Sequence, residues 1–293
     1  FHQTSKINSS NFFWLGKETS ILVNNWFMMY FLSVVLIGTV YPIFLDVISS
    51  QKISVGPPFY HKLIAPFLIP FLFAMAIGPS LKWIRSDLKD KIYLISLLII
   101  SILISFFIVK NFNTNVLINT ILISSALYLF YITLRDFFNK KYKNFAQNTA
   151  HFGFSLLILS ILFNNLFSSE IITNLRVGET YDNSKTKIVF ESINQKNEKN
   201  YKSIVANFNI INSKGINNNL SPELRIYNQP NITTSEADIK TTLMKDKFIV
   251  INLVQNQDYF NVRYQVKPFM LWIWLSVILI SFGGLMSFFK KRI

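Results

Sequence analysis

Six long apolar runs constrain the fold of this chain more strongly than any single residue does. They cover residues 26–48, 63–83, 92–109, 115–134, 149–167 and 268–289. A helix needs about 20 apolar residues to cross the roughly 30 Å hydrocarbon core of a bilayer, and its backbone polar groups must be satisfied within the segment. The runs therefore predict a polytopic α-helical membrane protein with about six transmembrane helices, embedded in the lipid bilayer.

The placement of the basic residues predicts how the chain crosses the membrane. The formal net charge is +14, and alternate short loops and tails carry thirteen lysines and arginines on one side against three on the other. The thirteen are Lys6, Lys17, Lys82, Arg85, Lys89, Lys91, Arg135, Lys140, Lys141, Lys143, Lys290, Lys291 and Arg292, and the three are Lys52, Lys62 and Lys110. The positive-inside rule places the richer side in the cytoplasm or matrix. Topology thus explains the charge, and no nucleic-acid partner is expected.

One large polar segment, residues 168–267, then lies on the outer side between the fifth and sixth runs. Strand-like stretches rich in Ile, Val, Phe and Tyr occupy 187–193, 202–212, 224–228, 248–254 and 262–266, and residues 235–239 resemble a capped helical turn. The segment predicts an exported, mainly antiparallel β module of about five strands with one helix, either an open sheet or a barrel. The expected domains are 1–25 on the inner side, 26–167 as a five-helix membrane region, 168–267 as the β module, and 268–293 as the final helix with a basic tail.

The chain contains no cysteine. This excludes disulfides, thiol catalysis and cysteine-ligated metal within it. No cleavable signal peptide is visible, since the first apolar run is too long for one. The sequence begins at Phe1 rather than Met, from which we expect a fragment or a processed piece.

His151 is the one histidine inside an apolar run, at the head of 149–167. Ionisable side chains in transmembrane segments are costly and mark a partner or a functional site, and histidine commonly holds haem iron. Position alone leaves two interpretations open: an interfacial histidine bonded to a neighbouring helix, or an axial haem ligand. His61 is interpreted as an interfacial polar residue, and His2 lies in the N-terminal tail.

Several further stretches are more specific than membrane physics requires. They are 52–60 with the proline-rich second run ending in Ile77-Gly78-Pro79, then 150–153, 221–227, 235–239, 267–274 and 283–284. In this order, from about Lys17 to the C-terminus, they resemble the C-terminal half of the CcmF/NrfE family of cytochrome c-type biogenesis proteins.

The resemblance implies part of a cytochrome c haem lyase. Such proteins accept haem from a CcmE-like haem chaperone and attach it to the Cys-x-x-Cys-His motif of apocytochrome c outside the membrane, with a CcmH-like thiol-handling chaperone as a further partner. They also hold a b-type haem between two transmembrane histidines, and His151 matches the second. The implied cofactor is therefore haem b, with His151 as an axial ligand of the haem iron. The implied location is a bacterial inner (plasma) membrane or a mitochondrial inner membrane.

The other functional residues of the family belong to its upstream half. These are the first transmembrane histidine, a tryptophan-rich haem-handling motif and two outer histidines, and none is present in this sequence. We therefore expect no catalytic residue here, and the upstream half of the same family as a partner, either in a truncated protein or in one encoded in parts. A ligating imidazole also needs an acceptor for its second ring nitrogen, and Gln147, Thr149 and Ser155 are near enough in sequence.

Two other classes of protein remain as alternatives. Pro66, Pro70 and Gly78-Pro79 interrupt the second run, and broken helices are typical of secondary transporters and channels. Against that interpretation, the sequence has no internal repeat and almost no carboxylate within its apolar runs. The last alternative is a non-catalytic assembly scaffold whose exported module docks a partner.

Overall fold

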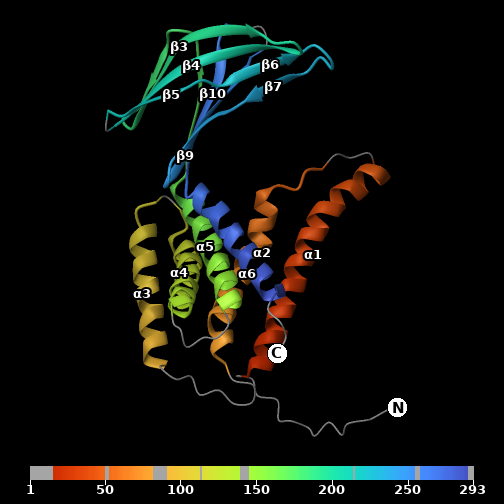
Figure 1. Cartoon of the computed structure of the whole chain (residues 1–293), viewed down its shortest axis with the longest axis vertical. Helices are drawn as coiled ribbons and strands as arrows, with labels where there is room; N and C mark the ends of the chain where they lie inside the picture. The colour runs from red at the N-terminus through yellow and green to blue at the C-terminus, as the bar shows by residue number, and fades with distance from the viewer. Residues whose placement is uncertain are drawn as a thin grey trace. The chain divides into compact units, whose positions relative to one another are not determined.

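The computed structural model describes residues 16–49, 53–81, 91–112, 114–138, 145–213, 215–254 and 258–289. The chain divides into two compact units (Figure 1). The helical unit comprises Phe1–Leu159 with Leu279–Ile293, and the sandwich unit comprises Ser160–Ile278. Each unit is described separately below.

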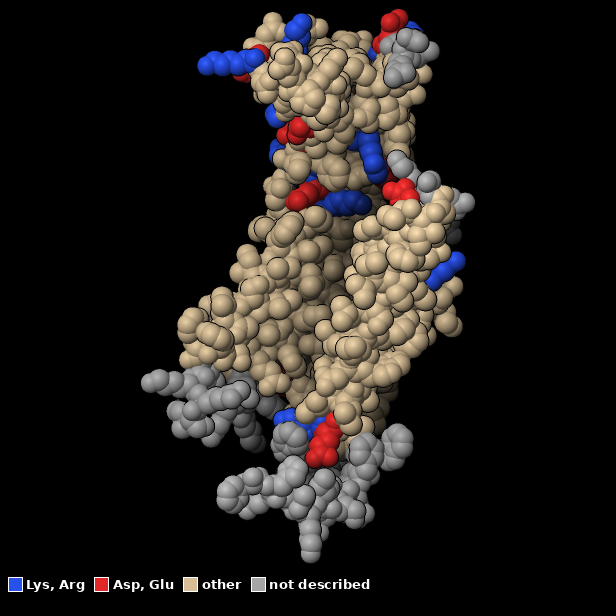
Figure 2. Space-filling view, turned by 90° about the vertical axis from the view of Figure 1, so that its right-hand side faces the viewer, with Lys and Arg blue, Asp and Glu red and all other residues tan. Residues whose placement is uncertain are grey.

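Six long helices account for the apolar runs within the described residues. They are α1 (Lys17–Ser49), α2 (Pro57–Ile77), α3 (Lys91–Val109), α4 (Val116–Phe138), α5 (Phe145–Phe167) and α6 (Met270–Phe289). Each is long and apolar enough to cross a membrane, and Figure 2 shows an almost uncharged band across the visible face of the helices. The prediction of a polytopic α-helical membrane protein is confirmed.

Helix α2 differs from its predicted run at both ends. It begins at Pro57, where a proline loses no helical hydrogen bond, and ends at Ile77, followed by the short 3₁₀ helix η1 (Gly78–Ser80). Pro66 and Pro70 lie inside α2 without ending it, so the predicted interruption there is wrong. Neighbouring helices can satisfy the backbone groups that such prolines free. The break is real only where Gly78-Pro79 turns the chain into η1.

The sandwich unit contains ten strands in the part of it that the structure describes. They are β1 (Ser169–Leu175), β2 (Thr180–Asp182), β3 (Thr186–Asn197), β4 (Tyr201–Asn212), β5 (Asn217–Leu220), β6 (Glu223–Tyr227), β7 (Thr233–Glu236), β8 (Asp238–Thr241), β9 (Lys245–Leu253) and β10 (Phe260–Pro268). One sheet has the order β1-β10-β9-β8, and the other has β2-β3-β4-β6-β7 with β5 beside β4. The mainly antiparallel module is confirmed, and it consists of two sheets rather than one sheet or a barrel.

The two sheets share one apolar core. Phe190 of β3 and Phe208 of β4 stack with ring centroids 4.4 Å apart, and the opposite sheet contributes Ile249, Ile251 and Tyr264. All five side chains are at most 2% exposed. Because side chains alternate between the faces of a strand, this burial fixes the register of both sheets.

The predicted helical turn at 235–239 is wrong. The segment forms the end of β7 and the start of β8, which pair with β6 and β9 of different sheets. The Asp238 carboxylate accepts a hydrogen bond from the backbone N–H of Ser221 at 2.6 Å instead of capping a helix. β-branched residues such as Thr233 and Ile239 favour the extended form. Ala237 is the point at which the chain passes from one sheet to the other.

Candidate functional site

Helix α5 places His151 by dividing its surface into three faces, each made of residues one turn apart. Ala146, Ala150 and Gly153 pack on α6. A side chain at Gly153 would lie 2.9 Å from the backbone nitrogen of Ile280, and one at Gly283 would lie 2.7 Å from that of Ala150. Small residues allow such close helix contacts. Gly153 therefore serves the approach of a neighbouring helix.

The second face of α5 packs on α4. The Asn148 side-chain amide donates to the Asp136 backbone carbonyl at 2.9 Å, and the hydroxyls of Ser155 and Thr133 are hydrogen-bonded at 2.8 Å. Phe152 lies between them along α5, with its ring 5.6 Å from that of Phe130. These contacts fix which face of α5 is turned toward α4.

The third face of α5, formed by Gln147, His151 and Phe154, lines a cavity of about 470 Å³. The facing walls come from α1 (Lys17, Ser20, Ile21, Asn24 and Met28) and from the end of α2 with η1 (Phe71, Ala74, Met75, Gly78 and Pro79). Pockets for small molecules and cofactors have volumes of roughly 300–1,000 Å³. The cavity is thus of a size to hold part of a cofactor beside a half-buried histidine.

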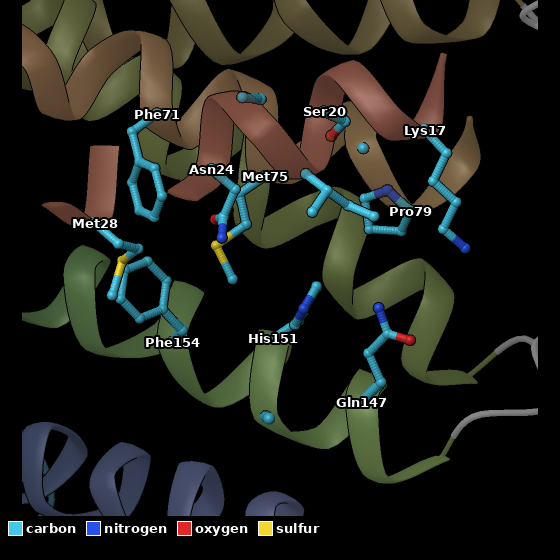
Figure 3. A pocket seen from close by; sticks show the side chains of 14 residues that line it. Lys17, Ser20, Asn24, Met28, Phe71, Met75, Pro79, Gln147, His151 and Phe154 are labelled. Atoms are coloured by element: carbon cyan, nitrogen blue, oxygen red, sulfur yellow. The ribbon is translucent and has the colours of Figure 1, made fainter. Parts of the chain in front are cut away.

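The cavity has an apolar end and a polar end (Figure 3). Met28, Phe71 and Phe154 lie on one side of His151, whereas Lys17 and Gln147 lie on the other. Phe71 and Phe154 contact each other edge to face, with ring centroids 6.0 Å apart. Such an arrangement suits a flat apolar ligand that carries anionic groups at one edge.

A second, much smaller cavity also reaches His151. Its volume is about 10 Å³, close to the least space that one water molecule needs. The side chains around it are those of Met75, Ala76, Pro79, Ile132, Thr133, Asp136, Asn148 and His151. His151, Met75 and Pro79 thus line both cavities, and the smaller one is also lined by the carboxylate of Asp136.

Asp136 is the site residue that the sequence analysis missed. It is 7% exposed, and one of its carboxylate oxygens accepts two hydrogen bonds from Arg135, at 2.9 and 3.0 Å. The available signal was a carboxylate in the last turn of an apolar helix, where an ionisable side chain indicates function. Residue 136 fell just past the predicted run, which ended at 134, and its nearness to His151 is a tertiary contact.

The predicted hydrogen-bond partners of His151 are mostly committed elsewhere. The Thr149 hydroxyl donates to the Phe145 carbonyl at 2.8 Å, and the Ser155 hydroxyl bonds to Thr133 and to the Phe152 carbonyl. Gln147 lines the large cavity with His151.

The other two histidines do not join the site. His61 is exposed on α2 and lines neither cavity, and His2 lies outside the described residues. Within the described ranges, no three His, Cys, Asp or Glu side chains come together to hold a metal ion. The large cavity instead has one imidazole, that of His151, in mainly apolar surroundings that include Met28 and Met75, and an imidazole there fits one axial position of a haem.

Comparison with known families matches the sandwich unit. Residues 166–268 match the family described as CcmF C-terminal beta-sandwich. The fold of 95% of the chain also resembles 46% of a solved structure titled Cytochrome c Heme Lyase CcmF, with a TM-score of 0.72 and 18% identity. That likeness supports the arrangement of both helices and strands.

Curated relatives extend the match along the chain. Cytochrome c-type biogenesis protein CcmF of Pseudomonas fluorescens is 26% identical over 294 residues, covering 94% of this chain and 44% of the relative. Cytochrome c-type biogenesis protein NrfE of Haemophilus influenzae is 24% identical, covering 99% of this chain and 47% of the relative. The chain thus spans somewhat less than half the length of these relatives.

Proposed function

We propose that the chain is part of a cytochrome c haem lyase and that His151 is an axial ligand of a b-type haem, because its sequence is similar to about half the length of the CcmF and NrfE relatives and its fold resembles part of a CcmF structure. The observation that carries the proposal is the position of His151 on the wall of the 470 Å³ cavity. A histidine that only packed between helices would not need such a space beside it.

The residues around the cavity fit a haem in three respects. His151 offers an imidazole nitrogen, which is a common haem ligand. Met28, Phe71 and Phe154 provide apolar contacts for the macrocycle, and Lys17 with Gln147 provides a cation and an amide for its propionates. Bound haem supplies the reversible one-electron chemistry of iron, and the protein orients it and tunes its electronics.

Asp136 completes the environment of the ligand. Metal-ligating histidines almost always donate their second N–H to a carboxylate, a carbonyl or a water. Because His151 and Asp136 border the same small cavity, we assign Asp136 as the acceptor, directly or through one water molecule. A carboxylate in that position raises the basicity of the imidazole and favours ferric over ferrous iron.

The partners follow from the proposed reaction. The upstream half of the family supplies the second axial histidine and the residues that handle haem on the outer side. A haem chaperone delivers the haem, and apocytochrome c presents the two thiols that bond to the haem vinyl groups, with a thiol-handling chaperone keeping them reduced. This chain contributes the second half of the haem pocket and the sandwich.

We further propose that the membrane is a bacterial or mitochondrial inner membrane and that the sandwich lies on its outer side. The basic residues of the short loops and tails support this orientation. A periplasmic reporter enzyme joined near Asn200 should be active, and one joined after Ile293 should be inactive. The reverse pattern would refute the orientation.

The haem assignment is tested by co-expressing the chain with an upstream half of the family and purifying the complex. A pyridine haemochrome assay should detect b-type haem in the wild-type complex. A transporter, the alternative class of protein, would contain none. His151→Ala should lower haem occupancy by about tenfold or more without lowering the amount of inserted protein. Added imidazole should restore part of the haem by filling the vacated position.

The matched control is His61→Ala, which removes an exposed imidazole from α2 and should leave haem occupancy unchanged. Full occupancy with an unaltered reduced spectrum in His151→Ala would contradict the ligand assignment. A scaffold without haem chemistry is distinguished by cytochrome c maturation in cells, which should fail in His151→Ala and proceed in His61→Ala.

A further inference from the structure

Three lysines lie on one face at the end of the β8–β9 hairpin. Lys240 of β8 is directly opposite Lys247 of β9, and Lys245 precedes Lys247 by two residues. Since alternate residues of a strand share a face and opposed residues of paired strands do too, the three side chains belong together. We call this set, Lys240, Lys245 and Lys247, the lysine face.

Lys247 is buried although it carries a charge. It continues the core-facing alternation of Ile249 and Ile251 and is 5% exposed. No described residue forms an ion pair with it. Burial, with Lys245 and Lys240 nearby, lowers the pKa of Lys247. A buried charge is costly unless it is paired, so the lysine face is suited to an anion from outside the chain.

On the opposite face of the same sheet, by contrast, positive and negative charges are paired. Glu170 of β1 accepts hydrogen bonds from Gln265 and Arg263 of β10. These bonds, with Lys267 nearby, lower the pKa of Glu170. Lys267 therefore shares its face with a carboxylate that is paired with an arginine. On the lysine face, Asp238 lies opposite Ile249, but its carboxylate accepts a hydrogen bond from the Ser221 backbone N–H and forms no ion pair with Lys247 among the described residues.

The tip of the β8–β9 hairpin is tied to the first turn of α6, a candidate membrane span. The backbone N–H of Phe269 donates to the Met244 carbonyl at 2.9 Å, and the indole N–H of Trp272 donates to the Leu243 carbonyl at 3.0 Å. The side chains of Leu243 and Met244 are 71% and 60% exposed. The tip thus presents two apolar side chains where α6 begins, and tryptophan is enriched at that level of a membrane.

We propose that the lysine face binds the phosphate of an anionic phospholipid headgroup. The exposed tip residues Leu243 and Met244 enter the apolar edge of the bilayer, and the lysine stems extend toward the headgroups as interfacial lysines do. A bound phosphate supplies the counter-charge that Lys247 lacks within the chain. The site is separate from the haem pocket and does not depend on the proposed haem chemistry.

The test uses the full chain purified in mild detergent and returned to nanodiscs of phosphatidylcholine with or without phosphatidylglycerol. Native mass spectrometry counts retained phosphatidylglycerol, and thermal unfolding measures the stabilisation it gives. Lys240→Gln with Lys245→Gln changes two exposed residues, and Lys247→Met keeps the length of the buried stem. Lys247→Met should weaken phosphatidylglycerol retention by roughly fivefold, and the double variant by roughly thirtyfold, since each lysine near an anionic surface contributes about 1 kcal/mol.

The matched control is Lys267→Gln, which removes one charge from the opposite face beside the same helix and should leave retention unchanged. Two results would overturn the proposal. One is equal retention in wild type, the double variant and Lys247→Met. The other is equal thermal stabilisation by inorganic phosphate alone, which would assign the face to a small anion instead of a lipid.

Discussion

The two units sort their polar and apolar side chains in opposite ways. In the sandwich unit the buried core is a cluster of apolar side chains that includes Phe190 and Tyr264. In the helical unit large apolar side chains such as Val47 and Ile92 are 80% and 85% exposed, whereas Thr133 and Asp136 are buried. Water surrounds the first kind of fold and lipid surrounds the second. Apolar side chains are therefore buried in the sandwich, whereas polar side chains can be buried in the helical unit.

This inversion bears on where the proposed cofactor site lies. A protein in lipid can place hydroxyls, a carboxylate and a histidine inside, because the apolar solvent does not compete for their hydrogen bonds. The core of the sandwich is mainly apolar, with Lys247 as a buried exception, and the ion pair of Glu223 with Arg225 at 3.2 Å is only partly buried. The cofactor site is accordingly expected in the helical unit, and the sandwich acts through its shape and surface.

The largest effect that separates the units is expected from Phe190→Ala. Removing a fully buried ring from the sandwich core should lower the free energy of unfolding by about 3–5 kcal/mol. Urea unfolding of the sandwich, monitored by its sensitivity to protease, measures this loss of stability. The haem content of the complex should stay near that of the wild type. Ile239→Ala, at a 57% exposed position, is the control. Equal loss of haem and of sandwich stability would show that the two units do not act separately.

A smaller effect, confined to the helical unit, is expected from Asp136→Asn. Loss of the carboxylate should raise the midpoint potential of the haem, with a change of about tenfold in the ferrous-to-ferric ratio, or about 59 mV for one electron. Redox titration measures it, and the ferric electron paramagnetic resonance spectrum reports the basicity of the axial imidazole independently. Arg135→Gln with Asp136→Asn keeps the net charge and should still raise the potential.

Asp46→Asn, at an exposed position of α1 that lines neither cavity, is the matched control for removing a carboxylate. An unchanged potential and spectrum in both Asp136 variants, in a complex that still binds haem, would refute the assignment of Asp136 while leaving that of His151 intact. A wild-type complex without haem would instead refute the haem site as a whole.

The smallest effect at neutral pH is expected from Tyr264→Phe. The buried Tyr264 hydroxyl has no hydrogen-bond partner among the described residues, so its removal should leave stability unchanged or slightly higher. Burial raises the pKa of Tyr264 to about 12. The unfolded tyrosine ionises near pH 10 and the folded one does not, so this group's contribution to stability falls as the pH rises from 10 to 12. Tyr264→Phe should lose less stability than wild type over that range in alkaline unfolding curves.

The helices and the long strands could be predicted because their patterns are local. An apolar run of membrane length permits little besides a helix. Strands β3, β4 and β9 are nine to twelve residues long, and each contains a stretch in which every second residue is buried, such as Ile188 and Phe190 in β3 and Ile249 and Ile251 in β9. The short strands β2, β5, β7 and β8 have three or four residues each. That is too short for alternation to be distinguished from a loop, and their pairing with longer strands is a tertiary effect.

The candidate site could be predicted only in part. His151 was found because a histidine is unusual in an apolar run, a property that the sequence displays directly. The cavity beside it requires α1, α2 and α5 to meet, and the approach of Asp136 requires the packing of α4 on α5. Neither follows from spacing along one helix. The prediction that Pro66 and Pro70 interrupt α2 was wrong because the free-energy cost of a proline within a helix depends on whether neighbouring groups satisfy the carbonyl that it leaves free.

The pairing of β1 with β10 has a consequence for how the chain is made. Ser169, near the start of the sandwich, lies opposite Val266, near its end, so the four-stranded sheet lacks its second strand until almost the whole segment has left the ribosome. Joining such distant segments carries a loop-closure cost that grows with their separation, and contacts of this kind form late. We expect the exported segment to remain sensitive to protease during synthesis. In a series of chains that end at successively later residues, only those that extend to Pro268 or beyond should be protease-resistant.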